Sequence, residues 1–70
     1  MKKYYVHDYD KSTYIDNMLA DTWGVTVEAG SPKEAAEIAT GKKVYRSTWK
    51  GSPILVYRAD KKGSYLYDYE

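Results

Sequence analysis

The chain has 70 residues, of which 43% are hydrophobic, and its aromatic residues are nine tyrosines and two tryptophans with no phenylalanine. This length allows a single domain over residues 1–70 and leaves no room for a separate catalytic lobe. The 11 lysines and arginines nearly balance the 10 aspartates and glutamates, and the absence of cysteine excludes disulfide bonds, thiolate zinc sites and cysteine nucleophiles.

The first predicted element is a strand over residues 3–9, where side chains alternate with a period of two. One side of this strand carries Tyr5, His7 and Tyr9. The next stretch, residues 10–21, fits either a loop or a short helix. Thr13 and Asp16 resemble a helix-capping pair, and an apolar stripe follows at helical spacing. Both interpretations stay open from the sequence.

A second strand is predicted over residues 23–29, again from alternation of apolar and polar side chains. A single helix follows over residues 31–40. Ser31 is placed to cap its first turn, with Glu34 three positions later, and Gly41 provides a natural C-terminal stop. Small alanines on the helix would let it lie close on a sheet.

Three further strands are predicted over residues 43–49, 54–59 and 64–69, with turns at 51–53 and 60–63. We expect these strands to form a meander after the helix. The predicted fold class is α+β, with one antiparallel sheet of four to five strands and a single short helix on one face. The element order is β-(loop or short helix)-β-α-β-β-β.

No catalytic or metal site is predicted. His7 is the only histidine, and without a second histidine or a cysteine it cannot form a strong transition-metal site or a recognisable nucleophile pair. Residues 8–12 begin like a calcium loop, but Thr13 and Leu19 stand where that loop needs glycine and a bidentate glutamate. We therefore expect a non-enzymatic protein without cofactors.

Membrane insertion is not expected, because the longest apolar run, residues 54–57, is far below the roughly 20 residues that span a bilayer. Met1-Lys2-Lys3 leads into tyrosines and charges, unlike a secretory signal. The sequence predicts a cytoplasmic domain.

The tyrosine pattern is the strongest functional feature of the sequence. If the helix covers one face of the sheet, some rows of aromatic side chains must line the other, open face. Aromatic side chains are typical of recognition surfaces, so the first hypothesis is a module that binds a protein partner through a Tyr/Trp-rich sheet face or an edge strand. The candidate partner-binding residues are Tyr45, Trp49, Tyr57, Tyr65, Tyr67 and Tyr69. The open alternative is that these tyrosines only pack the sheet.

The second hypothesis is single-stranded nucleic-acid binding, in which tyrosines stack on bases. Residues 31–62 hold eight bases and three acids, a net charge of 8 − 3 = +5. The candidate phosphate contacts are Arg46, Lys50, Arg58, Lys61 and Lys62. The formal net charge of only +1 favours the protein-binding hypothesis.

A homodimer formed by pairing of edge strands is a further hypothesis for the assembly of this chain. In general character the sequence is similar to the small single-domain proteins encoded by phages and other mobile elements, several of which bind and inhibit a host protein. This resemblance implies a protein partner and no particular site residue.

Overall fold

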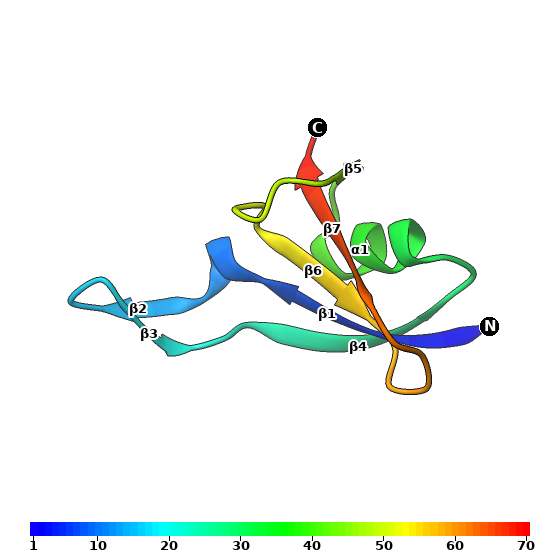
Figure 1. The fold of residues 1–70 in the computed structure, drawn as a ribbon, viewed down its shortest axis with the longest axis horizontal. Helices are drawn as coiled ribbons and strands as arrows, with labels where there is room; N and C mark the ends of the chain where they lie inside the picture. Colours follow the sequence, from blue (N-terminus) through cyan, green and yellow to red (C-terminus); the bar gives the residue numbers. More distant parts are fainter.

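Five strands form one antiparallel sheet, and one helix lies across one of its faces (Figure 1). The computed structural model describes residues 1–70. The sheet strands are β1 (Lys2–Asp8), β4 (Gly24–Ala29), β5 (Val44–Ser47), β6 (Ile54–Tyr57) and β7 (Ser64–Tyr69), and the helix is α1 (Pro32–Thr40). The strand order is β4-β1-β6-β7-β5, and every neighbouring pair is antiparallel. The predicted α+β fold class is confirmed. The structure contains no helix with the length and apolar character needed to cross a membrane.

The helix begins and ends where its sequence predicts. The hydroxyl of Ser31 accepts a hydrogen bond from the backbone N–H of Glu34 at 3.2 Å, and Pro32 occupies the first turn. At the other end Gly41 adopts φ 72°, and its N–H donates to the carbonyl of Glu37. A left-handed residue with no Cβ is the usual end of such a helix.

The three C-terminal strands do not form the predicted meander. β7 lies between β5 and β6 and pairs with both, so the segment at residues 51–53 is part of a crossing connection and not a hairpin turn. Burial explains this order. β6 buries Ile54 and Val56 and takes a central position, whereas β5 buries only Val44 and forms the edge. The alternation of each strand predicts its existence but not its neighbours.

Residues 10–21 are neither a plain loop nor an α-helix. After a short 3₁₀ turn η1 (Tyr9–Lys11), they form a separate hairpin of β2 (Thr13–Ile15) and β3 (Met18–Asp21). Asp16 and Asn17 have φ values of 52° and 65°, as a type I′ turn requires, and Asp and Asn tolerate this region better than most residues. The apolar residues that suggested a helical stripe instead form cross-strand pairs, Tyr14 with Leu19 and Ile15 with Met18.

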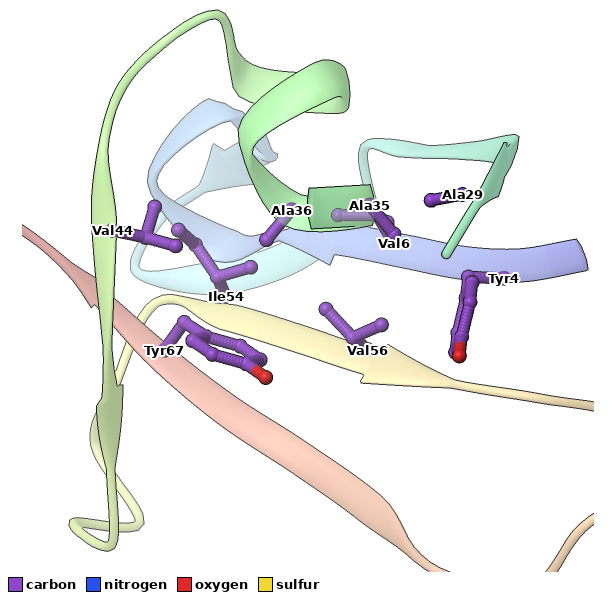
Figure 2. Packing of buried hydrophobic residues seen from close by; sticks show 9 residues of the cluster. All are labelled: Tyr4, Val6, Ala29, Ala35, Ala36, Val44, Ile54, Val56 and Tyr67. Atoms are coloured by element: carbon purple, nitrogen blue, oxygen red, sulfur yellow. The ribbon is translucent and has the colours of Figure 1, made fainter. Parts of the chain in front are cut away.

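The core lies between α1 and the sheet, and tyrosine completes it. The buried cluster consists of Tyr4, Val6, Ala29, Ala35, Ala36, Val44, Ile54, Val56 and Tyr67 (Figure 2). A nine-residue helix is about 13 Å long, whereas five strands span about 19 Å, so the helix leaves part of this face uncovered. Figure 2 shows Tyr4 and Tyr67 on either side of Val56, where the helix does not reach.

A buried carboxylate joins the first strand to the last. Asp8 is fully buried; one of its oxygens accepts a hydrogen bond from the Tyr69 hydroxyl, and the other accepts from the N–H of Asp10 at 3.0 Å. Burial raises the pKa of Tyr69 well above its ordinary value of 10.0, and the hydrogen bond to Asp8 raises it further. The Tyr69 hydroxyl therefore keeps its proton to a higher pH than an exposed tyrosine does.

Removing the Tyr69 hydroxyl should destabilise the fold. Tyr69→Phe deprives the buried Asp8 carboxylate of one of its donors, at an expected cost of about 1–3 kcal/mol in the free energy of unfolding. Tyr65→Phe is the matched control, because Tyr65 lies on the same strand and also packs against the core. Urea denaturation of both variants measures the effect. Equal losses in the two variants would contradict the role of this hydrogen bond.

The same pair predicts a dependence of stability on alkaline pH. Because the pKa of Tyr69 is raised in the folded state, the folded chain holds this proton more tightly than the unfolded chain does. The stability that it contributes is fully present below about pH 10 and is lost as the pH rises above that value. Unfolding free energies measured between pH 8 and 11 should fall less steeply for Tyr69→Phe than for the wild type. An unchanged slope in this variant would show that Tyr69 does not cause the decline.

Candidate functional site

The tyrosine rows of the strands divide between the two faces of the sheet. On β7, Tyr65, Tyr67 and Tyr69 point to the helix side, where Tyr67 is 4% exposed and the other two pack against the core. On β1 the buried residues Tyr4 and Val6 alternate with others that must point to the opposite face. The 65/67/69 row therefore belongs to the covered face, and Tyr67 is not accessible to a partner.

A patch of aromatic and aliphatic side chains lies on the uncovered face. We call this patch the open aromatic face; its residues are Tyr5, His7, Leu55, Tyr57 and Leu66, from the three central strands. The register places Tyr5 opposite Tyr57 and Leu55 opposite Leu66. All five side chains are half-buried.

The rings of this face are stacked in a defined geometry. The centroids of Tyr5 and Tyr57 are 5.3 Å apart with planes inclined by 33°, and those of His7 and Tyr57 are 5.6 Å apart with planes within 7°. The Nε2 of His7 lies 3.3 Å from the Tyr57 hydroxyl, within hydrogen-bond distance. Tyr57 therefore packs against both other rings within the chain itself.

A hollow of about 340 Å³ opens beside these rings. Tyr5, His7 and Tyr57 line it together with Thr22 and Thr26 at the β4 side. A second hollow, of about 370 Å³, also includes Tyr5 and lies between the N-terminus and the end of β6. The open aromatic face thus combines flat rings with shallow concave surface on both sides of Tyr5.

The imidazole of His7 lies directly on the backbone of Gly24. A Cβ at position 24 would come within 2.7 Å of the His7 Nδ1 and 2.9 Å of its Cε1. This Nδ1 is the one buried side-chain nitrogen or oxygen atom without a hydrogen-bond partner. Position 24 therefore requires glycine, because the His7 ring occupies the space that a Cβ would need.

Tyr45 and Trp49, also predicted as partner contacts, lie outside this patch. By alternation from buried Val44, Tyr45 points to the uncovered face at the β5 edge, and its side chain is exposed. Trp49 is exposed in the connection between β5 and β6, with its ring against Gly51. The six predicted residues are thus not one surface: two share the open face, one lies in a connection and three lie on the helix side.

The sequence identified only part of the open aromatic face. Tyr5 and His7 are recognisable as one side of a strand, but Leu55 and Leu66 were not among the candidates. The choice between Ile54 with Val56 and Leu55 with Tyr57 as the core pair cannot be made from alternation, because both pairs are apolar. The choice is decided by the register of β6 with β1 and β7, which places Ile54 and Val56 on the helix side.

The predicted phosphate contacts do not gather near the open aromatic face. The guanidinium of Arg46 lies 4.8 Å from the Tyr65 ring centre, and that of Arg58 lies 6.0 Å from the Tyr4 ring centre, both on the helix side. Arg58 also donates two hydrogen bonds to Asp60, at 2.8 and 2.5 Å. The other three bases, Lys50, Lys61 and Lys62, are exposed in connections between strands.

The pairing of Arg58 with Asp60 shifts both groups. The hydrogen bond from Arg58 lowers the pKa of Asp60, and the bond to Asp60 raises the pKa of Arg58. Both groups remain charged near neutral pH, so the pair carries no net charge toward a phosphate. No group of three or more His, Asp or Glu side chains is placed to hold a metal ion.

Searches of protein-family models, curated proteins and solved structures found no significant match to this chain. The function of the chain must therefore be inferred from the geometry of its surface.

Substituting Gly24 should disturb the ring stack. In Gly24→Ala the new methyl group overlaps the His7 imidazole, so the ring must leave its present position and its stack on Tyr57 is disturbed, with an expected loss of about 1–2 kcal/mol in unfolding free energy. Gly30→Ala is the matched control, because the nearest atom to its added Cβ would be a Glu34 oxygen at an ordinary 3.6 Å. Proton NMR of the His7 ring and chemical denaturation test both effects. An unmoved His7 resonance in Gly24→Ala would contradict the close approach.

Proposed function

We propose that this chain is a small non-enzymatic module that binds a protein partner through the open aromatic face of its sheet. The observation that carries the proposal is an uncovered sheet face occupied by Tyr5, Tyr57, Leu55 and Leu66, where an antiparallel sheet usually presents polar side chains to water. Aromatic and aliphatic side chains of this kind provide most of the binding energy in protein interfaces.

The ordered geometry of this face supports the proposal. Tyrosine contributes a large contact area with few rotatable bonds, and the stack of Tyr5, Tyr57 and His7 already restrains three of these rings. Side chains that are ordered before binding lose less entropy when a partner covers them. The adjoining 340 Å³ hollow would receive a side chain of the partner.

The charge distribution also favours a protein over a nucleic acid. Nucleic-acid binding by stacking needs rings and basic groups on the same surface. Arg46 instead lies on the helix side against Tyr65, and Arg58 lies against Tyr4 and is paired with Asp60 where both border the second hollow. The charges next to the face are mixed, since Lys3 on β1 lies opposite Glu28 on β4 in the register and Asp68 lies on β7.

The face ends at an edge strand that would extend the contact. β4 is the longer edge strand, with six residues against four in β5, and it contains no proline or lysine. Proline and lysine are the usual devices that prevent strand addition at an edge. A partner strand added to β4 would lie next to the hollow, so the same partner would contact backbone and rings together.

The test is a photo-cross-linking residue at position 66, on the open aromatic face, with the same residue at Ile38 on the exposed side of α1 as control. A protein cross-linked from 66 but not from 38 is then purified. Tyr5→Thr with Tyr57→Thr keeps strand-forming residues and should weaken its binding at least 30-fold, a hot-spot effect. Ile38→Thr should bind like the wild type. Unchanged binding by a folded double variant would place the site elsewhere.

The nucleic-acid alternative has its own measurement. Titration of tryptophan fluorescence with single-stranded oligonucleotides, at low and moderate salt, should show no saturable binding. Micromolar binding that weakens with salt and is lost in Arg46→Ala with Arg58→Ala would support the alternative instead.

A further inference from the structure

The β2–β3 hairpin projects away from the sheet and helix (Figure 1). Its cross-strand pairs are Tyr14 with Leu19 and Ile15 with Met18. Because neighbouring residues of a strand point to opposite sides, each face of the hairpin carries one of these apolar pairs. The side chains are 51%, 47%, 63% and 73% exposed in that order. The hairpin is therefore apolar on both faces beside its Asp16–Asn17 turn, and we call these four apolar side chains the tip.

A projecting two-stranded hairpin is only marginally stable by itself, so its base must be held by other contacts. The Ser12 hydroxyl donates to the carbonyl of Asp8 and accepts from the N–H of Trp23, which joins the two ends of the hairpin segment. The Tyr14 hydroxyl donates to the carbonyl of Tyr9, and the Lys11 ammonium lies 4.8 Å from the Trp23 ring centre. These contacts fix the direction of the hairpin and leave its apolar tip free.

The surface area of the tip identifies the kind of contact that would cover it. The four exposed side chains present roughly 450 Å² on two faces, about half of what one partner buries in a standard interface. Two tips lying side by side would cover only one face each, which is too little for a stable dimer. A cleft in a partner covers both faces at once.

Charge excludes a lipid surface as the preferred occupant. Residues 10–21 contain three aspartates, Asp10, Asp16 and Asp21, and one lysine, Lys11, a net charge of 1 − 3 = −2. Anionic lipid headgroups would repel this segment. Basic side chains around a cleft would attract it.

We propose that the β2–β3 hairpin inserts its tip into an apolar cleft of a protein partner, a cleft bordered by lysine or arginine. This contact uses a different surface from the open aromatic face. Both proposals assume a protein partner, but each has its own variants, so one can fail while the other stands.

The experiment places a photo-cross-linking residue at position 18, with position 38 on α1 as control, and maps the cross-linked peptide in the captured protein. The cross-link should lie in an apolar cleft flanked by basic residues. With the purified partner, Ile15→Thr with Met18→Thr should weaken binding at least 10-fold, and Asp16→Asn with Asp21→Asn should weaken it several-fold at low salt. Ile38→Thr should have no effect. Tyr5→Thr with Tyr57→Thr, measured on the same partner, tests the open aromatic face separately.

Loss of binding through unfolding is excluded by the unfolding midpoint, which should be unchanged because the tip side chains make no contribution to the core. The proposal is overturned by a cross-link only to a second copy of the chain, or by no cross-link from position 18. It is also overturned by binding to phosphatidylcholine–phosphatidylglycerol vesicles that depends on the tip, or by full affinity of the Ile15→Thr, Met18→Thr variant.

Discussion

The length of α1 constrains the rest of this structure. Nine residues make a helix that covers only part of a five-stranded sheet, and the chain has no second α-helix to cover what remains. Tyr4 and Tyr67 belong to the buried cluster on the helix side, where they lie on either side of Val56 (Figure 2). A phenylalanine there would expose an apolar ring edge, whereas tyrosine has a hydroxyl for the water at the boundary. Part of the tyrosine excess therefore follows from the short helix, which does not cover the whole core.

The same constraint determines where the bases lie. Rings at the boundary of the core attract guanidinium and ammonium groups, and Arg46, Arg58 and Lys42 lie over Tyr65, Tyr4 and Tyr69 respectively. Each base then covers an aromatic ring that the helix leaves partly open. The opposite face keeps stacked rings with few charges. The positions of Arg46, Arg58 and Lys42 thus follow from how the core is completed.

Local signals predicted the local structure well. The Ser31 cap, the Gly41 stop and the alternation of each sheet strand lie in a few consecutive residues, and the structure confirms them. Strand order was not predictable. β7 lies between β6 and β5, which brings Tyr67 into the core, but no residue of β5 or β6 indicates that β7 is its neighbour. The facing of β6 was equally undetermined, since both of its sides are apolar. The hairpin at residues 10–21 was missed because cross-strand spacing around a two-residue turn imitates a helical stripe.

The hairpin and the open aromatic face are joined by the chain itself. The hairpin segment leaves the sheet at the end of β1 and returns at the start of β4, and these two strands carry Tyr5, His7 and Gly24 beside the hollow. Asp8 fixes this junction, because it holds Tyr69 from the last strand while its backbone bonds to Ser12 and Trp23. Asp8 therefore joins the base of the hairpin to the sheet, through its backbone on one side and its carboxylate on the other. The hollow lies next to the base of the hairpin, so the two proposed contact surfaces adjoin one another.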